Sequence, residues 1–260
     1  MMEINYTRTG RGKPLLLIHG LGSSRRAWSP VIPLLQGERE LIAIDLPGHG
    51  TTPAQADSGT FAGLARSLEE WLCSEGLADT DMVGSSMGAR LVLEMARRGR
   101  CGASVALDPG GFWAGWERAY LSTTLRSSVL LLRGLRRMLP RLSHNVASRT
   151  ALLAQLSARP WALDGDLVES ELTSFAGTAT FDALVKDLAY GPLQKGPAAP
   201  RAGRVTIGWG RHDRLCFPVQ AGRAMKTFPE AQLVWFDKSG HFPMWDQPED
   251  TAATILRATG

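Results

Sequence analysis

Short, almost continuous apolar runs alternate along the chain with longer segments in which apolar residues recur every three or four positions. The short runs are typical of strands buried on both faces, and the longer segments have the spacing of amphipathic helices. Strands are expected within residues 13–20, 39–50, 80–88, 103–108, 204–210 and 231–237. Helices are expected over residues 23–35, 60–76, 86–99, 180–191 and 248–258.

The order of these elements predicts the fold class. Strands that alternate with helices are typical of an α/β protein, with a mostly parallel sheet flanked by helices. The strand signal disappears between residues 112 and 180, and a segment rich in proline and glycine, 191–203, then leads back to it. We therefore predict a core made of residues 1–111 and 181–260, with a helical cap inserted at residues 112–180.

Composition argues against several classes of function but does not identify one. The 260 residues are 44% hydrophobic and 21% charged, and the net charge of +4 does not imply a nucleic-acid partner. Three widely spaced cysteines, Cys73, Cys101 and Cys216, lack the spacing of metal ligands and are typical of reduced cytoplasmic thiols. The N-terminus lacks the apolar run of a signal peptide, and no segment approaches a membrane span, so a cytoplasmic location is expected.

The segment "DMVGSSMGAR" (81–90) passes from an expected strand into an expected helix. A serine exposed on such a sharp turn needs small residues two positions before and two positions after it. Gly84 and Gly88 stand in this relation to Ser86, and not to Ser85. Ser86 is therefore the candidate nucleophile, and the alternative is a glycine-rich turn with incidental serines.

A serine nucleophile needs a base and an acid that orients the base. His241 follows the last expected strand and Asp213 follows the strand before it, so both should lie at the same sheet edge as Ser86. A solvated loop histidine is the alternative for His241. Asp108, which follows the strand at 103–108, competes with Asp213 for the role of acid.

The oxyanion formed by attack on a carbonyl needs backbone donors near the serine. The glycines of "HGLGSS" (19–24) allow amides to point inward, so the Leu21 N–H is expected to act together with the Met87 N–H. His19 is then expected to be a structural residue of this turn rather than a second base.

Five segments, "LLLIHGLGSS", "AIDLPGHG", "MVGSSMGA", "GRHD" and "SGHFPMWDQPE", resemble in their order the landmarks of the α/β-hydrolase family. The resemblance covers the chain outside the cap and implies the α/β-hydrolase fold with the chain order Ser86, Asp213, His241. It departs from the common pattern at Ser85 and Ala89. The family's dehalogenases and epoxide hydrolases use aspartate as nucleophile, and Ser86 argues against both.

The predicted function is hydrolysis of a carboxylic ester, lactone or thioester through an acyl-enzyme, with no metal or organic cofactor implied. A biosynthetic acyltransferase or cyclase could use the same triad, and a binding protein could keep the fold without catalysis. The complete triad argues against the binding protein, since a binder needs neither a base nor an acid.

The cap adds two further expectations. Its residues 112–160 carry one acid, Glu117, and eight arginines, at positions 118, 126, 133, 136, 137, 141, 149 and 159. A helix over residues 127–142, unless Pro140 shortens it, would place Leu131, Leu135, Met138 and Leu142 on one face and arginines on the other. The arginines would form either a solvated face or a contact for an anionic substrate, carrier or membrane surface. The candidates for an apolar substrate pocket are Trp113, Trp116, Phe242 and Trp245.

Overall fold

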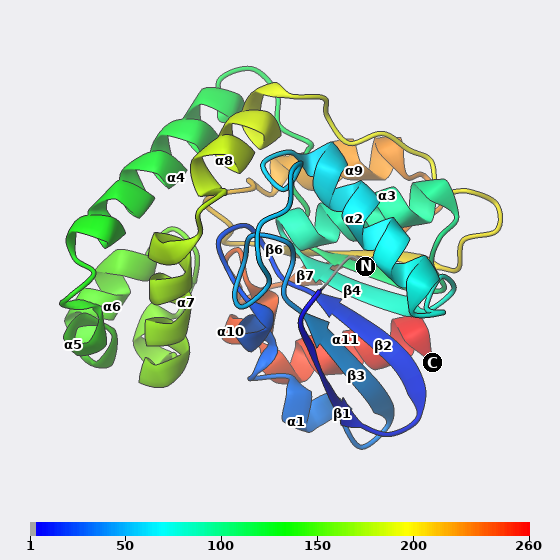
Figure 1. Cartoon of the computed structure of the whole chain (residues 1–260), viewed down its shortest axis with the longest axis horizontal. Helices are drawn as coiled ribbons and strands as arrows, with labels where there is room; N and C mark the ends of the chain where they lie inside the picture. The colour runs from blue at the N-terminus through cyan, green and yellow to red at the C-terminus, as the bar shows by residue number, and fades with distance from the viewer. Residues whose placement is uncertain (1–3) are drawn as a thin grey trace.

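One seven-stranded sheet runs through a computed structural model of the protein, which describes residues 4–260 (Figure 1). The strands are β1 (Tyr6–Gly10), β2 (Lys13–Ile18), β3 (Arg39–Ile44), β4 (Asp81–Ser85), β5 (Ser104–Leu107), β6 (Val205–Gly210) and β7 (Gln232–Phe236). Their order in the sheet is β1-β3-β2-β4-β5-β6-β7, and all neighbours are parallel except β1 and β3. The prediction of a mostly parallel sheet is confirmed.

Helices cover both faces of the sheet. The helices outside the segment between β5 and β6 are α1 (Ile32–Leu35), α2 (Phe61–Ser74), α3 (Met87–Arg98), α9 (Val219–Thr227), α10 (Pro243–Asp246) and α11 (Pro248–Thr259). Successive strand residues point to opposite faces. Leu16 and Ile18 pack in one apolar cluster with α2, α3 and α9, whereas Leu15 and Leu17 pack in another with α1 and α11.

The segment between β5 and β6 is helical. Its elements are α4 (Glu117–Gly134), α5 (Leu139–His144), α6 (Val146–Leu153), the 3₁₀ helix η2 (Pro160–Ala162), α7 (Gly165–Gly177) and α8 (Phe181–Tyr190). We call α4, α5, α6, η2 and α7 the helical insertion. These helices lie together beyond the end of the sheet, and α8 packs both on α4 and on α2 (Figure 1).

Two expected helices differ from the structure. The helix expected over residues 23–35 is a 3₁₀ turn, η1 (Arg25–Trp28), followed by the single turn α1. Pro30 interrupts this stretch, because proline lacks the N–H that a helix interior needs. The continuous helix expected over residues 127–142 ends at Gly134, and Pro140 lies in the first turn of α5.

The apolar face expected for residues 127–142 is not the buried face. Leu131 and Met138 were expected on the apolar face, but their exposed fractions are 53% and 52%. The buried side of α4 is formed instead by residues such as Leu121, Val129 and Leu132. The helix therefore buries a different face from the one expected.

The edge strand β1 was not predicted. All five of its residues are exposed, so it has no alternation of apolar and polar side chains to reveal it. Its backbone pairs with β3 in antiparallel register, with Thr7 opposite Ala43 and Arg8 opposite Ile42. Backbone pairing along the sheet edge, rather than side-chain burial, therefore forms this strand.

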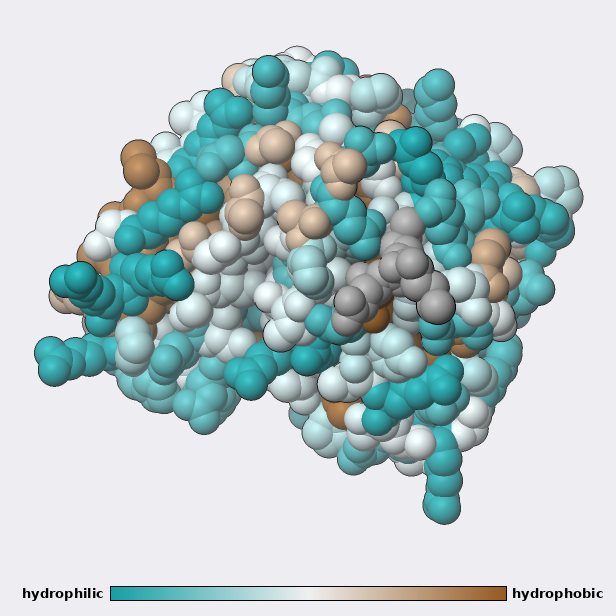
Figure 2. Space-filling model, in the orientation of Figure 1, coloured by the Kyte–Doolittle hydropathy of each residue, from teal (hydrophilic) through white to brown (hydrophobic). Residues whose placement is uncertain are grey.

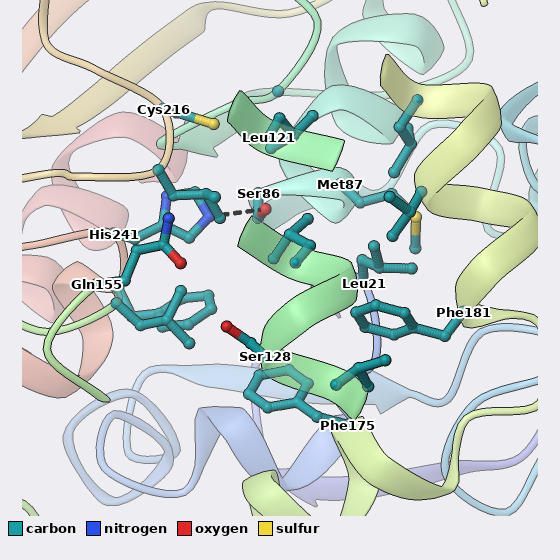
Figure 3. A pocket seen from close by; sticks show the side chains of 18 of the residues that line it. Leu21, Ser86, Met87, Leu121, Ser128, Gln155, Phe175, Phe181, Cys216 and His241 are labelled. Carbon is teal, nitrogen blue, oxygen red and sulfur yellow. Dashed lines mark hydrogen bonds between the residues drawn. The ribbon is translucent and has the colours of Figure 1, made fainter. Parts of the chain in front are cut away.

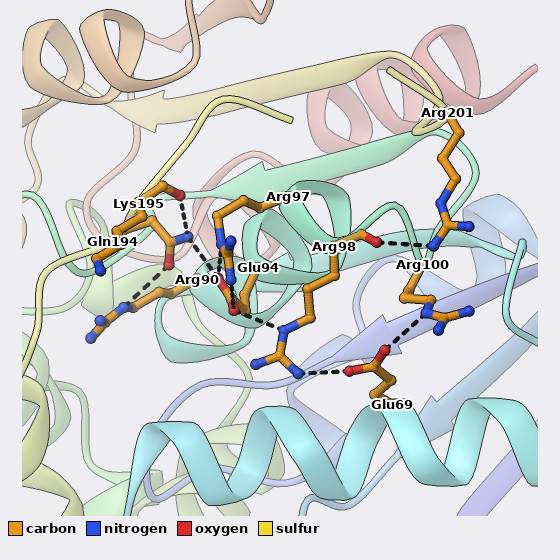
Figure 4. A network of polar contacts seen from close by, with 9 residues as sticks. All are labelled: Glu69, Arg90, Glu94, Arg97, Arg98, Arg100, Gln194, Lys195 and Arg201. Atoms are coloured by element: carbon orange, nitrogen blue, oxygen red, sulfur yellow. Dashed lines mark hydrogen bonds and ion pairs between the residues drawn. The ribbon is translucent and has the colours of Figure 1, made fainter. Parts of the chain in front are cut away.

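A polar network anchors the proline- and glycine-rich segment 191–203 to the sheet's helical cover (Figure 4). Glu94 on α3 accepts bonds from Arg97 and Arg98, and Arg98 also pairs with Glu69 on α2. Gln194 donates to Glu94 over 3.4 Å. Segment 191–203, which leads back to β6, is therefore held against α3.

None of the helices in residues 4–260 has the length and apolar character needed to cross a bilayer.

Candidate active site

Ser86 lies at the sharp turn between β4 and α3. Its backbone has φ 56° and ψ −113°, a region that costs a residue with a side chain on the order of 1–3 kcal/mol. A Cβ on Gly84 would collide with the carbonyl of Gly88, and a Cβ on Gly88 would collide with the carbonyls of Ile18 and His19. The two glycines therefore allow the close packing that holds Ser86 in this conformation.

Three side chains from separate loops form a hydrogen-bonded chain. His241 Nε2 lies 2.8 Å from Ser86 Oγ, and His241 Nδ1 lies 2.8 Å from Asp213 Oδ2. In the neutral histidine tautomer that fits both contacts, Nδ1–H donates to Asp213 and Nε2 accepts from the serine hydroxyl. His241 and Asp213 are both buried, so bulk water does not compete for these bonds.

The loops that carry His241 and Asp213 are held by further hydrogen bonds. Asp213 Oδ1 accepts from the amides of Leu215 at 2.7 Å and Cys216 at 3.0 Å, which fixes the orientation of the carboxyl group. Asp246 on α10 accepts from the Gly240 amide at 2.8 Å, next to His241. Asp246 was not predicted. An acid five residues after the histidine was the available signal.

Asp108 does not contact His241. It is fully buried at φ 47°, and its Oδ1 accepts from the Gly210 amide at 2.8 Å. Its Oδ2 has no hydrogen-bond partner within residues 4–260. Burial and the neighbouring negative charge of Asp213 raise the pKa of the Asp108 carboxyl well above its ordinary value. This shift favours the neutral form of the Asp108 carboxyl.

The turn after β2 brings its backbone against Ser86. A Cβ added to Gly20 would come within 3.1 Å of the Ser86 Cβ. Leu21 and Met87 both line the space in front of the serine, and neither amide donates a hydrogen bond within the described part of the chain. Both amides are thus available to an oxyanion.

His19 packs under this turn. Its Nδ1 donates to the Gly20 carbonyl at 2.7 Å, and its Nε2 accepts from the Leu46 amide at 3.0 Å. Burial lowers the pKa of His19, so the ring stays neutral and fits both bonds. This position agrees with the structural role expected for His19.

A pocket opens from Ser86 and His241 toward the helical insertion (Figure 3). No lysine, arginine, aspartate or glutamate lines it among residues 4–260. Its polar side chains, besides Ser86 and His241, are those of Ser128, Gln155 and Cys216. Its apolar walls come from α4, α7, α8 and the turn after β2, and include Leu21, Leu121, Leu125, Val129, Phe175 and Phe181.

Two of the four aromatic residues expected in the pocket line it, namely Trp113 and Phe242. The other two do not. Trp116 is 64% exposed and packs on Tyr120 and Phe217. Trp245 packs behind Phe242, with ring centroids 4.1 Å apart, and donates its indole N–H to the Ala27 carbonyl.

The aliphatic walls of the pocket were not predicted either. The apolar residues of α4 and α8 have the spacing of a helix, and this spacing is the same whether they line a pocket or pack against another helix. The pocket becomes visible only when α4, α7 and α8 meet in front of Ser86.

Asp213, Cys216 and His241 have potential ligand atoms within 4.8 Å of one another, the one such group in the described residues. Two of these atoms already share the hydrogen bond between His241 and Asp213. Burial and the charge of Asp213 raise the pKa of the Cys216 thiol well above its ordinary value, which disfavours the thiolate that binds metals. The donor set therefore fits a hydrogen-bonded relay better than a metal centre.

Comparison with known proteins agrees with this geometry. Residues 15–254 match the model of the alpha/beta hydrolase family. The chain is 26% identical, over 98% of its length and 90% of the relative's, to 2-hydroxy-6-oxononadienedioate/2-hydroxy-6-oxononatrienedioate hydrolase 1 of Dechloromonas aromatica. It is 28% identical, over 95% of its length and 77% of the relative's, to Lipase 1 of Psychrobacter immobilis.

Among solved structures, the fold is similar to that of a thermophilic esterase from Thermogutta terrifontis, with a TM-score of 0.75 at 20% identity. That alignment covers 98% of this chain and 92% of the esterase. The match of the family model to nearly the whole sequence agrees with the sheet order and with the turn at Ser86. The chain belongs to the α/β-hydrolase family.

Proposed function

We propose that this protein is a serine hydrolase that cleaves a neutral carboxylic ester, lactone or thioester with an apolar acyl group. The observation that carries the proposal is the unbroken relay from Asp213 through His241 to Ser86, which ends in a pocket lined by apolar side chains. A serine activated in this way attacks carbonyl carbon, and an uncharged pocket favours an uncharged acyl group.

In the acylation half of the reaction, Ser86 Oγ attacks the carbonyl carbon while His241 Nε2 takes the hydroxyl proton. The electron pair of the carbonyl bond moves to oxygen, and the amides of Leu21 and Met87 stabilise the resulting oxyanion. Asp213 stabilises the imidazolium. The imidazolium then protonates the leaving alcohol or thiol as its bond to the acyl carbon breaks, which leaves an acyl ester on Ser86.

In the second half, His241 takes a proton from water, whose oxygen attacks the acyl carbon. The same two amides hold the second oxyanion. When that intermediate collapses, the bond to Ser86 Oγ breaks, His241 returns the proton to the serine, and the carboxylic acid leaves. The enzyme thus ends the cycle in its starting protonation state.

The proposal includes a lid, formed by residues 112–180 on a core of residues 1–111 and 181–260. Side chains of α4 and α7 form the side of the pocket opposite the sheet. Such a cover excludes water, which strengthens the electrostatic interactions inside the pocket.

Two arguments favour this proposal over a hydrolase of acidic substrates and over a binding protein without catalysis. The Dechloromonas relative is named for a dioate substrate, and no side chain with a permanent positive charge lines this pocket among residues 4–260 to pair with a carboxylate. A binding protein would need neither the His241 base nor the Asp213 acid. An acyltransferase would use the same acyl-enzyme, and products formed with added alcohol or amine acceptors distinguish it from a hydrolase.

The test compares Ser86→Ala with Ser85→Ala in assays on neutral esters, lactones and thioesters. Ser85 is the matched control, because its buried hydroxyl has no hydrogen-bond partner in the described residues. We expect Ser86→Ala to lower kcat by several orders of magnitude and Ser85→Ala to have a much smaller effect. Unaltered turnover by folded Ser86→Ala protein would exclude the mechanism.

A further inference from the structure

The outer surface of the helical insertion has an unusual charge balance. Of the eight arginines in residues 112–160, Arg133 alone forms an ion pair within residues 4–260, with Asp182. The single acid of this stretch, Glu117, is buried and paired with Arg223. The positive charges on this surface are therefore almost uncompensated by nearby acids.

The same stretch of the chain exposes large apolar side chains. The described residues include eleven exposed large hydrophobic side chains, and five of them fall within residues 130–161. They are Leu130 at 71% exposure, Leu131 at 53%, Met138 at 52%, Val146 at 51% and Trp161 at 53%. Figure 2 shows brown apolar side chains beside long teal ones over α4.

Arginines and apolar residues alternate along the chain and share helix faces. Arg126 and Leu130 are one turn apart on α4, and Val146 and Arg149 are one turn apart on α6. The Arg149 guanidinium donates to the Trp161 carbonyl at 2.8 Å, which joins α6 to η2. The two kinds of side chain are therefore interspersed rather than separated into distinct patches.

Acidic residues of the insertion lie elsewhere. On α7, Asp166 and Glu169 line a surface groove together with Arg136, and His144 on α5 lies 3.2 Å from Glu169. Arg136 therefore has acidic neighbours in this groove and does not belong to the uncompensated arginine surface.

We propose that the outer surface of α4, α5, α6 and η2 docks onto an anionic lipid bilayer. Interfacial membrane binding combines burial of exposed apolar side chains among headgroups and acyl chains with attraction of arginines to anionic lipids. Tryptophan is favoured at the level of the headgroups, where Trp161 would lie. An acidic protein would complement the arginines alone and would leave the exposed leucines without a partner.

The position of the pocket fits this docking surface. Ser128 on α4 is exposed and also lines the pocket, and Leu131 follows it one turn later on the same helix. Docking would thus place the exposed end of the pocket close to the lipid. The proposal does not depend on the reaction catalysed at Ser86, because it rests on the surface alone.

The test is sedimentation with vesicles of phosphatidylcholine and with vesicles of an equimolar mixture of phosphatidylcholine and phosphatidylglycerol. We expect binding to the anionic vesicles only, and weaker binding at high salt. The charge variant combines Arg126→Gln, Arg137→Gln and Arg141→Gln, and should bind on the order of 100-fold more weakly. The same three positions changed to lysine should retain binding.

The apolar variant combines Leu130→Ser with Leu131→Ser and should weaken vesicle binding roughly 10-fold or more. The matched control combines Arg11→Gln with Val219→Ser, both exposed and outside the insertion, and should bind like the unaltered protein. Turnover of a water-soluble ester reports folding and should be unchanged in all four variants. If the unaltered protein also shows no turnover, the proposed function is wrong. The docking proposal is then tested by the vesicle-binding measurements alone.

Equal binding to both kinds of vesicle, no binding to either, or binding that the glutamine or serine variants retain would overturn the proposal. A purified acyl carrier protein serves as the acidic protein probe. Salt-sensitive binding to that protein, without binding to anionic vesicles, would also overturn it and would assign the surface to a protein partner.

Discussion

At the scale of single residues, the site depends on two neighbouring buried carboxyl groups that have different hydrogen-bond partners. Asp213 accepts two backbone N–H bonds and the His241 N–H, whereas Asp108 accepts one backbone N–H bond. Burial and the neighbouring charge of Asp213 raise the pKa of Asp108, the carboxyl with fewer donors. The hydrogen bonds therefore favour Asp213 over Asp108 as the acid that orients His241, a choice that the sequence left open.

This preference predicts the ranking of two matched substitutions. Asp213→Asn removes the charge that stabilises the imidazolium and favours the wrong tautomer of His241, so kcat/KM should fall by roughly 10⁴-fold. Asp108→Asn replaces a neutral acid with a neutral amide and keeps the oxygen that accepts from Gly210, so its effect should stay within about 10-fold. Steady-state kinetics of both folded variants decide the ranking, and the reverse order would assign the acid to Asp108.

At the scale of elements, one buried hydrogen bond joins the insertion to the turn that carries the Leu21 amide. Ser23 donates to Glu171 of α7 at 2.5 Å, and the other oxygen of Glu171 has no partner in the described residues. Complete burial raises the pKa of Glu171 to about 8. The link between α7 and the turn therefore holds a protonated glutamic acid at neutral pH.

This raised pKa predicts a pH-dependent stability difference. As pH rises from the ordinary pKa of 4.5 to about 8, Glu171 loses its proton in the unfolded chain but keeps it in the folded protein. The contribution of Glu171 to the free energy of unfolding therefore falls across this window, by on the order of 5 kcal/mol, and changes no further above it. The Glu171→Gln variant has no carboxyl group to titrate at this position. The difference between its free energy of unfolding and that of the unaltered protein should therefore increase in favour of the variant from pH 5 to pH 8.

Denaturant unfolding at several pH values measures the difference. Glu75→Gln is the control, because Glu75 is exposed at the end of α2. A stability difference between Glu171→Gln and the unaltered protein that is constant from pH 5 to 8 would contradict a buried, protonated Glu171.

The elements also show which features the sequence could predict. Strands β2 to β7 were expected because buried parallel strands are continuous apolar runs, and the helix α2 was expected from its spacing and the glycine after it. Strand β1 was missed because all its side chains are exposed. The buried face of α4 was misassigned because it follows from the elements that pack against the helix rather than from the helix's own pattern.

At the scale of the whole molecule, the sequence predicted the three residues of the relay but only two residues of the pocket wall, Trp113 and Phe242. Strand ends of a parallel sheet share one edge, so Ser86, Asp213 and His241 could be brought together from strand order alone. The pocket walls come from helices far apart in the sequence, and their meeting is a tertiary property. The same limit explains why Trp116 and Trp245, close to the site in sequence, do not line the pocket.

The pocket predicts a dependence on the acyl chain. In a series of p-nitrophenyl esters, kcat/KM should rise by up to about 4-fold for each added methylene until the pocket is filled, since burial of a methylene contributes about 0.8 kcal/mol. Esters whose acyl chain ends in a carboxylate should be poor substrates, because no cationic side chain lines the pocket in the described residues. A preference for those acidic esters would contradict the neutral pocket.

The central claim is that His241 and Asp213 make Ser86, and no other serine, the nucleophile. Its most direct test is intact-mass and peptide analysis after treatment with a fluorophosphonate, which phosphonylates an activated serine. The account predicts one adduct per chain, on Ser86, in the unaltered protein and in Ser85→Ala, and none in Ser86→Ala. An adduct on another residue, or an unlabelled unaltered protein, would contradict it.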